Sequence, residues 1–329
     1  MKKILLCMLV IVLAFGAFAA CGNNNEPPPP PPPANGDNGN GNGDGEVRVG
    51  FASPNLNDTF QTFIIAAAQE RADALGFSMS VHDAREDIIT QQDQVRTMIV
   101  QEFDAIIVVP VNSEGMAPLI EEGIAAGIPL IFVNRNPFDE DETLPAGIFY
   151  VGSQEVIAGE FQGQYLIEVM GEEGGVGILM GILANEGAVQ RTQGNENILG
   201  NYPGIEILAR ESGNWQPDQG MALTENWLTV FGDRLNAILA NNDEMALGAI
   251  EALRAAGRDD VIVMGVDAIP SALDLVVAGD MAATVLQDAT GQGGGAMDKV
   301  ANIVGGGSPP SITWIDFVLI TQENVADFM

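Results

Sequence analysis

Polar and aromatic side chains follow several apolar runs of this 329-residue sequence, each near the point where a run ends. Carboxylate, amide and guanidinium groups can each form hydrogen bonds with two neighbouring hydroxyl groups. Aromatic rings pack against the C–H face of a sugar ring. This combination predicts a sugar-binding site, and the side chains concerned are Asp58, Phe60, Asn134, Arg135, Asn185, Arg191, Trp215, Asn242 and Asp267.

Two acids and two arginines in this set balance each other. Asp58 and Asp267 carry two negative charges, and Arg135 and Arg191 carry two positive charges. A net charge of zero favours a neutral ligand in a closed site.

Several of these residues also have a purely structural interpretation. Asp267 and Asn242 are each placed to cap a following helix. Phe60 and Trp215 would suit a hydrophobic core, and Arg135 would suit an exposed loop. Residue type and position alone leave these alternatives open.

The composition excludes several other kinds of chemistry. With 13 basic residues against 45 acidic ones, the chain has a net charge of -32 and lacks the clustered positive charge that nucleic acid requires. The single histidine and the absence of a CxxC pair exclude HExxH zinc chemistry, zinc fingers and thiol redox pairs. No cofactor is predicted. A carboxylate pair made of Asp58 and Asp267 leaves an extracellular carbohydrate hydrolase as an alternative.

The apolar runs have the length of buried strands, and amphipathic stretches such as Thr59–Leu75, Thr90–Glu102 and Glu244–Ala256 separate most of them. Such alternation predicts parallel sheets covered by helices on both faces, with ligands beyond the carboxyl ends of the strands. Because ten strands are many for one sheet, we predict an α/β fold of two doubly wound lobes. The expected strands are Val47–Phe51, Phe77–Val81, Ala105–Val109, Pro129–Val133, Ile148–Val151, Val176–Met180, Ile205–Ala209, Leu235–Leu239, Val261–Val266 and Ala283–Leu286.

The N-terminal segment is predicted to be a signal peptide followed by a lipidated linker. In residues 1–20, two lysines precede an apolar stretch, which is the pattern of a signal peptide. The string FAAC at 18–21 resembles the bacterial lipobox and predicts a lipid on Cys21, with an ordinary secretory signal as the alternative. Residues 21–45 are rich in Pro, Gly and Asn and predict a solvated linker. We therefore expect a body anchored by lipid on the extracytoplasmic side of the cell membrane.

From residue 47 onward the chain resembles the type I periplasmic sugar-binding proteins of ABC transporters, in the galactose/glucose and ribose branch. The strings that carry the resemblance are NDTFQT, VNRNP, YVGS, GAVQRT, ANNDEMALGAIEAL, GVDAIPSAL and ATVLQDA. The resemblance implies two Rossmann-like lobes joined by three chain crossings, with the ligand between them. Its implied lobes comprise residues 46–152 plus 289–317 and residues 153–288 plus 318–329.

The resemblance also implies a function. A monomeric, non-catalytic protein would capture a monosaccharide, a hexose such as galactose or glucose, and deliver it to an ABC permease in the membrane. The alternative is a lipoprotein that reports sugar to a chemoreceptor or sensor kinase. Ligand contacts are implied at most of the positions named above, Arg135 matches an arginine of ribose binders, and Gln287 stands where galactose binders have an asparagine.

The chain departs from the galactose pattern just before Arg191. Galactose binders have a histidine and an aspartate where this chain has Asn185 and Gly187. Asn185 can still donate to a hydroxyl group, whereas Gly187 lacks a carboxylate, so Gly187→Asp is expected to strengthen hexose binding. The calcium loop of galactose binders is missing between Val169 and Val176, and no metal is predicted.

Overall fold

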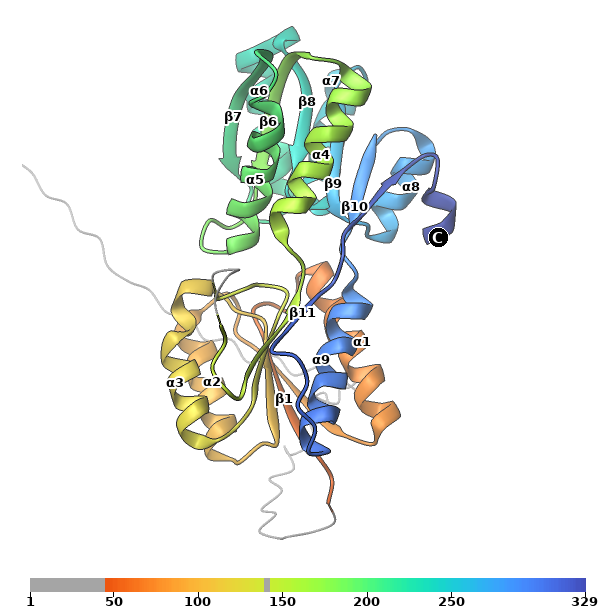
Figure 1. Cartoon of the computed structure of the whole chain (residues 1–329). Coiled ribbons are helices and arrows are strands. Elements are labelled where there is room, and N and C mark those ends of the chain that lie inside the picture. The colour runs from red at the N-terminus through yellow and green to blue at the C-terminus, as the bar shows by residue number, and fades with distance from the viewer. Residues whose placement is uncertain (1–44, 139–142) are drawn as a thin grey trace, which may run out of the picture. The chain divides into compact units, whose positions relative to one another are not determined.

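The computed structural model describes residues 45–138 and 143–329. Asp44–Met329 form one compact unit, which contains two six-stranded sheets with helices on both faces of each (Figure 1). The expected signal peptide, the lipidation site Cys21 and nearly all of the linker lie outside the described residues. Among the helices that the structure describes, none is long and apolar enough to cross a membrane.

The first sheet has the strand order β11-β5-β4-β3-β1-β2, and all its neighbouring strands are parallel. Its central strands β3 and β4 are buried at every residue, because helices cover both faces of the sheet. The strands are β1 (Arg48–Ser53), β2 (Ser78–Asp83), β3 (Ala105–Val108), β4 (Leu130–Val133), β5 (Ile148–Gly152) and β11 (Ile312–Trp314).

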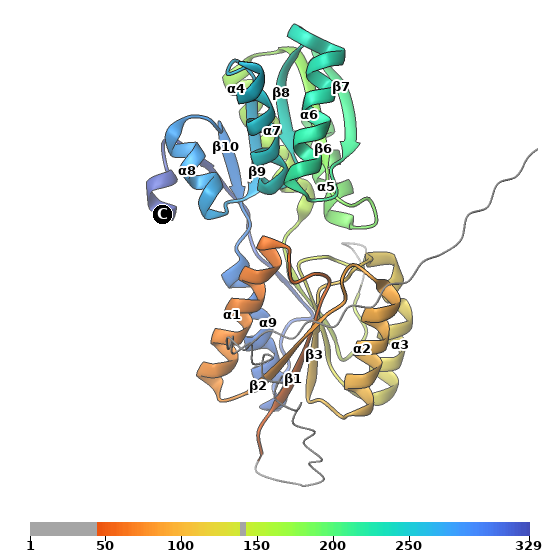
Figure 2. The ribbon, with the colours of Figure 1, turned by 180° about the vertical axis from the view of Figure 1, so that it is seen from behind.

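Two pairs of helices cover the first sheet. One face packs against α1 (Thr59–Leu75) and α9 (Ala289–Val304), and the other against α2 (Ile88–Val100) and α3 (Ala117–Ala126), as Figures 1 and 2 show. Helix α2 starts before the expected Thr90, because the Asp87 carboxylate caps it by accepting a hydrogen bond from the Thr90 N–H at 2.6 Å.

The second sheet repeats this order as β12-β10-β9-β8-β6-β7, and β12 is antiparallel to β10. Helices α4 and α5 lie on one face, and α6, α7 and α8 on the other. The strands are β6 (Glu173–Met180), β7 (Gly204–Ser212), β8 (Leu235–Ala240), β9 (Ile262–Asp267), β10 (Ala283–Leu286) and β12 (Val318–Thr321). The helices are α4 (Glu155–Met170), α5 (Glu186–Leu199), α6 (Pro217–Phe231), α7 (Asp243–Ala256) and α8 (Pro270–Ala278), with 3-10 turns at Ser113–Met116, Gly232–Arg234 and Val325–Phe328.

The chain passes between the two sheets three times: from β5 to α4, from β10 to α9 and from β11 to β12. We call the part built on the first sheet the first lobe and the part built on the second sheet the second lobe. The prediction of two doubly wound α/β lobes joined by three crossings is confirmed. All ten expected strands are present, whereas β11 and β12 were not anticipated.

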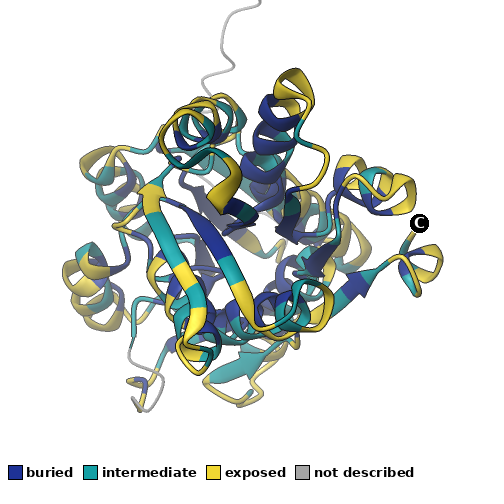
Figure 3. Ribbon diagram, turned by 90° about the horizontal axis from the view of Figure 1, so that it is seen from above, coloured by how far each residue is buried: buried dark blue, intermediate teal, exposed yellow. Residues whose placement is uncertain are grey.

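In each sheet, the strand order reverses at one point. Strand β1 lies between β2 and β3, and β6 lies between β7 and β8, so the connections that leave neighbouring strands diverge at these points. Figure 3 shows buried strands inside the lobes and exposed outer faces on the helices. The loops that follow the carboxyl ends of these strands carry buried polar side chains, among them Asn134, Asn242 and Asp267.

Candidate functional site

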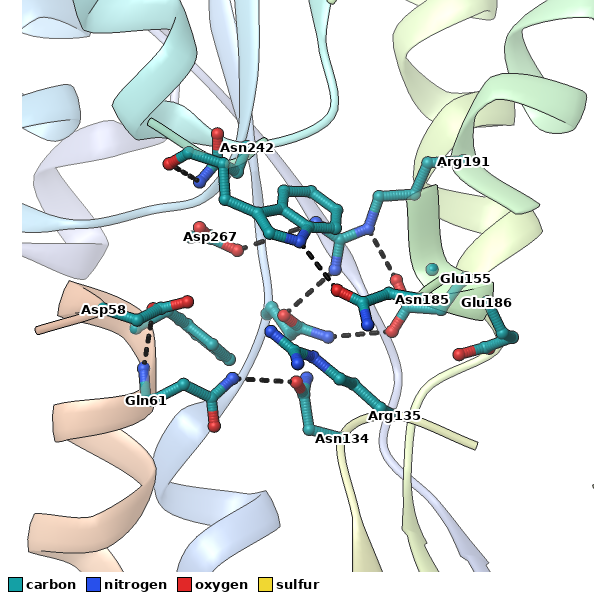
Figure 4. A pocket seen from close by; sticks show the side chains of 14 residues that line it. Asp58, Gln61, Asn134, Arg135, Glu155, Asn185, Glu186, Arg191, Asn242 and Asp267 are labelled. Atoms are coloured by element: carbon teal, nitrogen blue, oxygen red, sulfur yellow. Dashed lines mark hydrogen bonds and ion pairs between the residues drawn. The ribbon is translucent and has the colours of Figure 1, made fainter. Parts of the chain in front are cut away.

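The loops at the carboxyl ends of both sheets meet in one pocket, which Figure 4 shows from close by. The space inside it that a water-sized sphere can occupy is about 40 Å³, because the side chains from the two lobes lie close together. Every residue that the sequence predicted to bind ligand lines it: Asp58, Phe60, Asn134, Arg135, Asn185, Arg191, Trp215, Asn242, Asp267 and Gln287. The same pocket is also lined by Gln61, Glu155, Glu186 and Gly187.

Arg191 on α5 is the centre of a buried polar network. Its Nε donates to Glu155 at 2.6 Å, one terminal nitrogen donates to the Asn241 carbonyl at 2.5 Å, and the other donates to Gln287 at 3.1 Å. Gln287 completes the ring by donating to the second oxygen of Glu155 at 2.9 Å. Burial alone would lower the pKa of Arg191, but the carboxylates of Glu155 and Asp267 raise it above its ordinary value. The guanidinium is therefore charged and held in one orientation.

Asp267 lies at the end of β9 and faces the pocket (Figure 4). Its backbone φ is 122°, a region that side chains other than glycine rarely adopt. The carboxylate is 3.8 Å from a terminal nitrogen of Arg191, and no group among the described residues donates a hydrogen bond to it. The capping alternative for Asp267 is wrong, because α8 starts after Ile269 without a side-chain cap.

Burial is the main cause of an elevated pKa at Asp267. The charges of Asp243 and Asp58 raise this pKa further, and Arg191 opposes the shift without cancelling it, so the pKa of Asp267 lies well above its ordinary value. Asp243 is itself buried and accepts hydrogen bonds from the Thr284 hydroxyl at 2.7 Å and from the backbone N–H of Ile269 at 3.0 Å.

Polar contacts hold Trp215 at its indole and at its backbone. Its Nε1 donates to the Asn185 amide oxygen at 2.9 Å, and its backbone carbonyl accepts from Asn242 at 3.3 Å. Its ring centroid is 5.7 Å from the guanidinium carbon of Arg191, close enough for a cation–π contact. This rigid ring can serve as a platform for the apolar face of a ligand.

Asn185 and Asn242 each combine two roles. Asn185 was expected to donate to a ligand hydroxyl, but it accepts from Trp215 and donates to the Val111 carbonyl at 2.8 Å. It therefore positions the indole and links the two lobes. Asn242 lines the pocket and also caps α7, accepting from the Met245 N–H at 3.1 Å, so the capping alternative holds for this residue alongside its place in the pocket.

The first lobe contributes an amide pair and an arginine. Gln61 donates to the Asn134 amide oxygen at 3.1 Å, and Asn134 has a left-handed backbone with φ 66°. Arg135 is buried, not exposed as its alternative supposed; it donates to the Pro110 carbonyl at 2.9 Å and lies 4.0 Å from the Glu86 carboxylate.

Asp58 and Phe60 lie where α1 begins. One carboxylate oxygen of Asp58 caps the helix by accepting from the Gln61 N–H at 3.1 Å, and the other has no hydrogen bond among the described residues. Phe60 both lines the pocket and packs into the hydrophobic core of the first lobe. Phe60 therefore combines the two roles that the sequence offered as alternatives, that of a pocket residue and that of a core residue.

Two glutamates of the pocket were not predicted. Glu155 follows the end of β5, so it would have been found by examining the residues after that strand, as was done for other strands. Glu186 directly follows the predicted Asn185. Glu186 accepts from the backbone N–H of Asn136 in the first lobe at 3.1 Å. Burial and the charge of Glu155 raise the pKa of Glu186 to about 8.

These glutamates change the charge of the site. Four carboxyl groups and two guanidinium groups line the pocket, so the sequence analysis counted too few acids, while the raised pKa values of Glu186 and Asp267 favour the neutral form of these two groups. Glu155 also occupies the place beside Gly187, since a Cβ at Gly187 would lie 3.6 Å from the Glu155 carboxyl carbon. The carboxylate that Gly187 lacks is thus supplied from α4.

Residues 45–138 and 143–329 contain no group of three or more His, Cys, Asp or Glu side chains arranged to hold a metal ion. That the protein binds no metal stays a prediction from the sequence.

Comparison with known proteins identifies the family. Residues 49–308 match the model of the periplasmic binding protein domain. A protein of Rhizobium meliloti that is assigned to rhizopine binding is 37% identical over 285 residues, which cover 85% of this chain and 92% of that protein.

Solved structures agree with this match. An ABC transporter solute-binding protein from Bacillus halodurans with bound myo-inositol has a TM-score of 0.81 and 35% identity. The match covers 88% of this chain and 99% of the Bacillus halodurans chain. A periplasmic solute-binding protein from Actinobacillus succinogenes with bound D-allose has a TM-score of 0.79 and 30% identity, with coverages of 86% and 100%. The chain therefore belongs to the type I periplasmic binding proteins, the family of sugar- and polyol-binding solute-binding proteins of ABC transporters.

Proposed function

We propose that this protein captures a monosaccharide or a related six-membered ring polyol between its lobes and delivers it to an ABC permease. The observation that carries the proposal is the pocket itself, in which Trp215 offers an apolar platform and buried polar side chains from both lobes surround it. Side chains such as Asp267 and Asn242 can bind ring hydroxyls. The myo-inositol that one relative holds is a six-membered ring polyol, and the D-allose that another holds is a monosaccharide.

The hexoses galactose and glucose are the first candidates from the sequence, and myo-inositol and D-allose join them through the relatives. A thermal-shift screen against D-galactose, D-glucose, D-allose, D-ribose and myo-inositol tests the proposal. A ligand at 100 times its Kd adds ~2.7 kcal/mol to the free energy of unfolding, so a true ligand raises Tm. Amino acids serve as controls, and stabilisation by an amino acid with none by any polyol would refute the proposal.

We also propose that the lobes move as the units implied by the sequence, residues 46–152 plus 289–317 and residues 153–288 plus 318–329. Contacts between the lobes support closure over the pocket: the Thr59 hydroxyl lies 2.5 Å from the Glu244 carboxylate, and the Ser113 N–H donates to the Ala184 carbonyl at 3.4 Å. We take the protein to be a monomer, which sedimentation analysis can check.

Lipid attachment at Cys21 is part of the proposal and rests on the sequence string at 18–21. A Cys21→Ser variant should leave the protein unprocessed or released from the membrane. Membrane fractionation and metabolic labelling with a fatty acid measure this outcome. A variant that is processed and fractionates like the unmodified protein would show that the lipobox interpretation is wrong.

A further inference from the structure

Asp267 lies at a bend of the backbone that few side chains tolerate. Its φ is 122° and that of the next residue, Ala268, is 59°, so two successive residues other than glycine adopt a costly backbone conformation. The Asp267 carboxylate is 3.8 Å from the Arg191 guanidinium, which is beyond hydrogen-bond distance. Contact with Arg191 therefore does not by itself fix the bend, which needs support from elsewhere in the second lobe.

Two buried side chains that do not line the pocket, Asp243 and Thr284, support this bend. One carboxylate oxygen of Asp243 accepts a hydrogen bond from the Ile269 N–H at 3.0 Å, and the other accepts one from the Thr284 hydroxyl at 2.7 Å. The Thr284 oxygen in turn accepts from the Ala268 N–H at 3.3 Å. The two amides that directly follow Asp267 are thus both bound by the Asp243–Thr284 pair.

A glycine in β9 makes room for this pair. Gly265 is the register partner of Thr284 on β10, and a Cβ at Gly265 would lie 2.0 Å from an Asp243 carboxylate oxygen. The carboxylate therefore lies directly against the backbone of β9. Although Asp243 is the first residue of α7, both of its oxygens bond to groups outside that helix. These bonds tie the start of α7 to the end of β9.

We infer that Asp243 and Thr284 are positioning residues, which fix the bend at Asp267 and so hold its carboxyl group toward the pocket without lining the pocket themselves. The inference rests on the proposed function, since it explains how one ligand-binding group of that site is kept in place. A side chain that is already held in one orientation loses little freedom when a ligand binds. In the alternative, a purely structural role, loss of the pair lowers stability and leaves affinity unchanged.

Two matched substitutions separate these roles. Thr284 and Thr224 are both completely buried, and the Thr224 hydroxyl donates within α6 to the Gly220 carbonyl. Valine keeps the shape of threonine and removes the hydroxyl group in either case. Calorimetry with the ligand found in the thermal-shift screen should show a roughly fivefold or greater rise in Kd for Thr284→Val and a change within about twofold for Thr224→Val. Thr284→Ser retains the hydroxyl group and should restore the Kd.

A double-mutant cycle shows whether the effect on affinity passes through Asp267. In the Asp267→Ala background, Thr284→Val should change Kd by less than about twofold, because the side chain that the pair positions is already absent. A loss of affinity that persists undiminished in this background would overturn the inference, because Thr284 would then act on binding by another route.

Amide hydrogen exchange tests the pair without any ligand. Relative to the amides of β8, the Ala268 N–H should exchange about tenfold faster or more in Thr284→Val. The Ile269 N–H should respond in the same way to Asp243→Ala, and Thr284→Val still decides if that variant does not fold. Asp259→Ala, which removes an exposed carboxylate outside the pocket, should change neither amide. Unchanged exchange at Ala268 in Thr284→Val would overturn the inference.

Failure of the inference is distinct from failure of the proposed function. If the unmodified protein binds a polyol and Thr284→Val binds it as tightly as Thr224→Val does, the inference is overturned and the proposed function stands. If no polyol binds to the unmodified protein, the proposed function fails, and the exchange of the Ala268 amide decides separately whether the pair supports the bend at Asp267.

Discussion

At the scale of single residues, the site depends on the buried ion pair between Arg191 and Glu155. Arg191 and Glu155 are 5% and 2% exposed, and Gln287 bonds to both. Removing one member of such a pair leaves an uncompensated buried charge and typically costs 3–5 kcal/mol. The pair therefore holds the pocket wall, while Asp267, which has no donor among the described residues, remains for the ligand.

The Asp267→Ala variant is expected to weaken ligand binding at least tenfold. A hydrogen bond to a charged group contributes about 1.5–3 kcal/mol, and ~1.4 kcal/mol corresponds to one decade in Kd. Calorimetry with the ligand found in the screen measures the change, with Asp259→Ala as the control. An unchanged Kd would remove Asp267 from the binding site.

The structure reverses the expectation for Gly187→Asp. A carboxylate at this position would lie against the Glu155 carboxyl, whose carbon is 3.6 Å from the added Cβ, and beside Glu186. Repulsion between like charges then disfavours the bound state. We expect Gly187→Asp to weaken hexose binding, and Gly187→Asn, which adds no charge, to weaken it less. Tighter binding by the aspartate variant, measured by calorimetry, would restore the expectation from the sequence.

At the scale of elements, the position of Arg191 depends on the packing of α4 against α5. The two helices touch through glycines: a Cβ at Gly159 would lie 1.9 Å from the Arg191 carbonyl oxygen, and one at Gly194 would lie 2.1 Å from the Val156 carbonyl oxygen. Such contacts with backbone can be relieved only if the helices move apart. Glycine here brings the arginine close to Glu155.

Gly159→Ala is therefore expected to lower the free energy of unfolding by about 1–3 kcal/mol, the usual cost of overpacking, and to weaken ligand binding because it displaces α5. Urea denaturation and calorimetry measure the two effects. The matched control is Gly294→Ala in α9, where an added Cβ meets nothing within 4 Å and a gain of roughly 0.4–1 kcal/mol is expected. Equal effects of the two substitutions would contradict this explanation.

At the scale of the whole molecule, the three crossings between the sheets are the only covalent connections between the lobes in the part of the chain that the structure describes. Groups from both lobes line the pocket, so a ligand can favour the closed arrangement only by contacting both. We expect small-angle scattering to show a smaller radius of gyration at saturating ligand. The Asp267→Ala variant at the same ligand concentration is the control, and an unchanged profile of the unmodified protein would contradict closure.

The stability of the ligand-free protein is expected to fall as the pH rises from 5 to 8. Burial raises the pKa of Glu186 to about 8, of Asp243 to about 7 and of Asp267 well above its ordinary value. The native state therefore keeps protons that the unfolded chain loses above pH 4, and this stabilisation is lost as the pH rises through the native values. The lowered pKa of His82 acts in the opposite direction near pH 6.

Urea denaturation at pH 5 and pH 8 should thus give a free energy of unfolding at least ~1 kcal/mol lower at pH 8, since one pKa unit corresponds to about 1.4 kcal/mol. Glu186→Gln keeps the acceptor for Asn136 but does not titrate, so the fall should be smaller in this variant. A free energy of unfolding that rises from pH 5 to pH 8 would show that the buried carboxyl groups do not determine the pH dependence of stability.

Much of the fold and of the site was predicted from local patterns. The ten expected strands are β1–β10, and the polar residues that follow their ends line one pocket. Strands β11 and β12 have only 3 and 4 residues, too few to show a period, and they form strands because they pair with β5 and β10. Their place depends on partners more than 30 residues away, which no local pattern reveals.

The sequence by itself determined the alternation of strands and helices and the residue types at the strand ends, because both follow from periodicities and neighbours along the chain. Only the tertiary structure decided which charges meet. Glu155 on α4 and Gln287 between the lobes reach Arg191 on α5 across 36 and 96 residues, and Glu186 joins them from the start of α5. Electrostatic interactions depend on distance in space and on burial, so the full set of ionisable groups in the pocket became apparent only when the loops of both sheets were brought together.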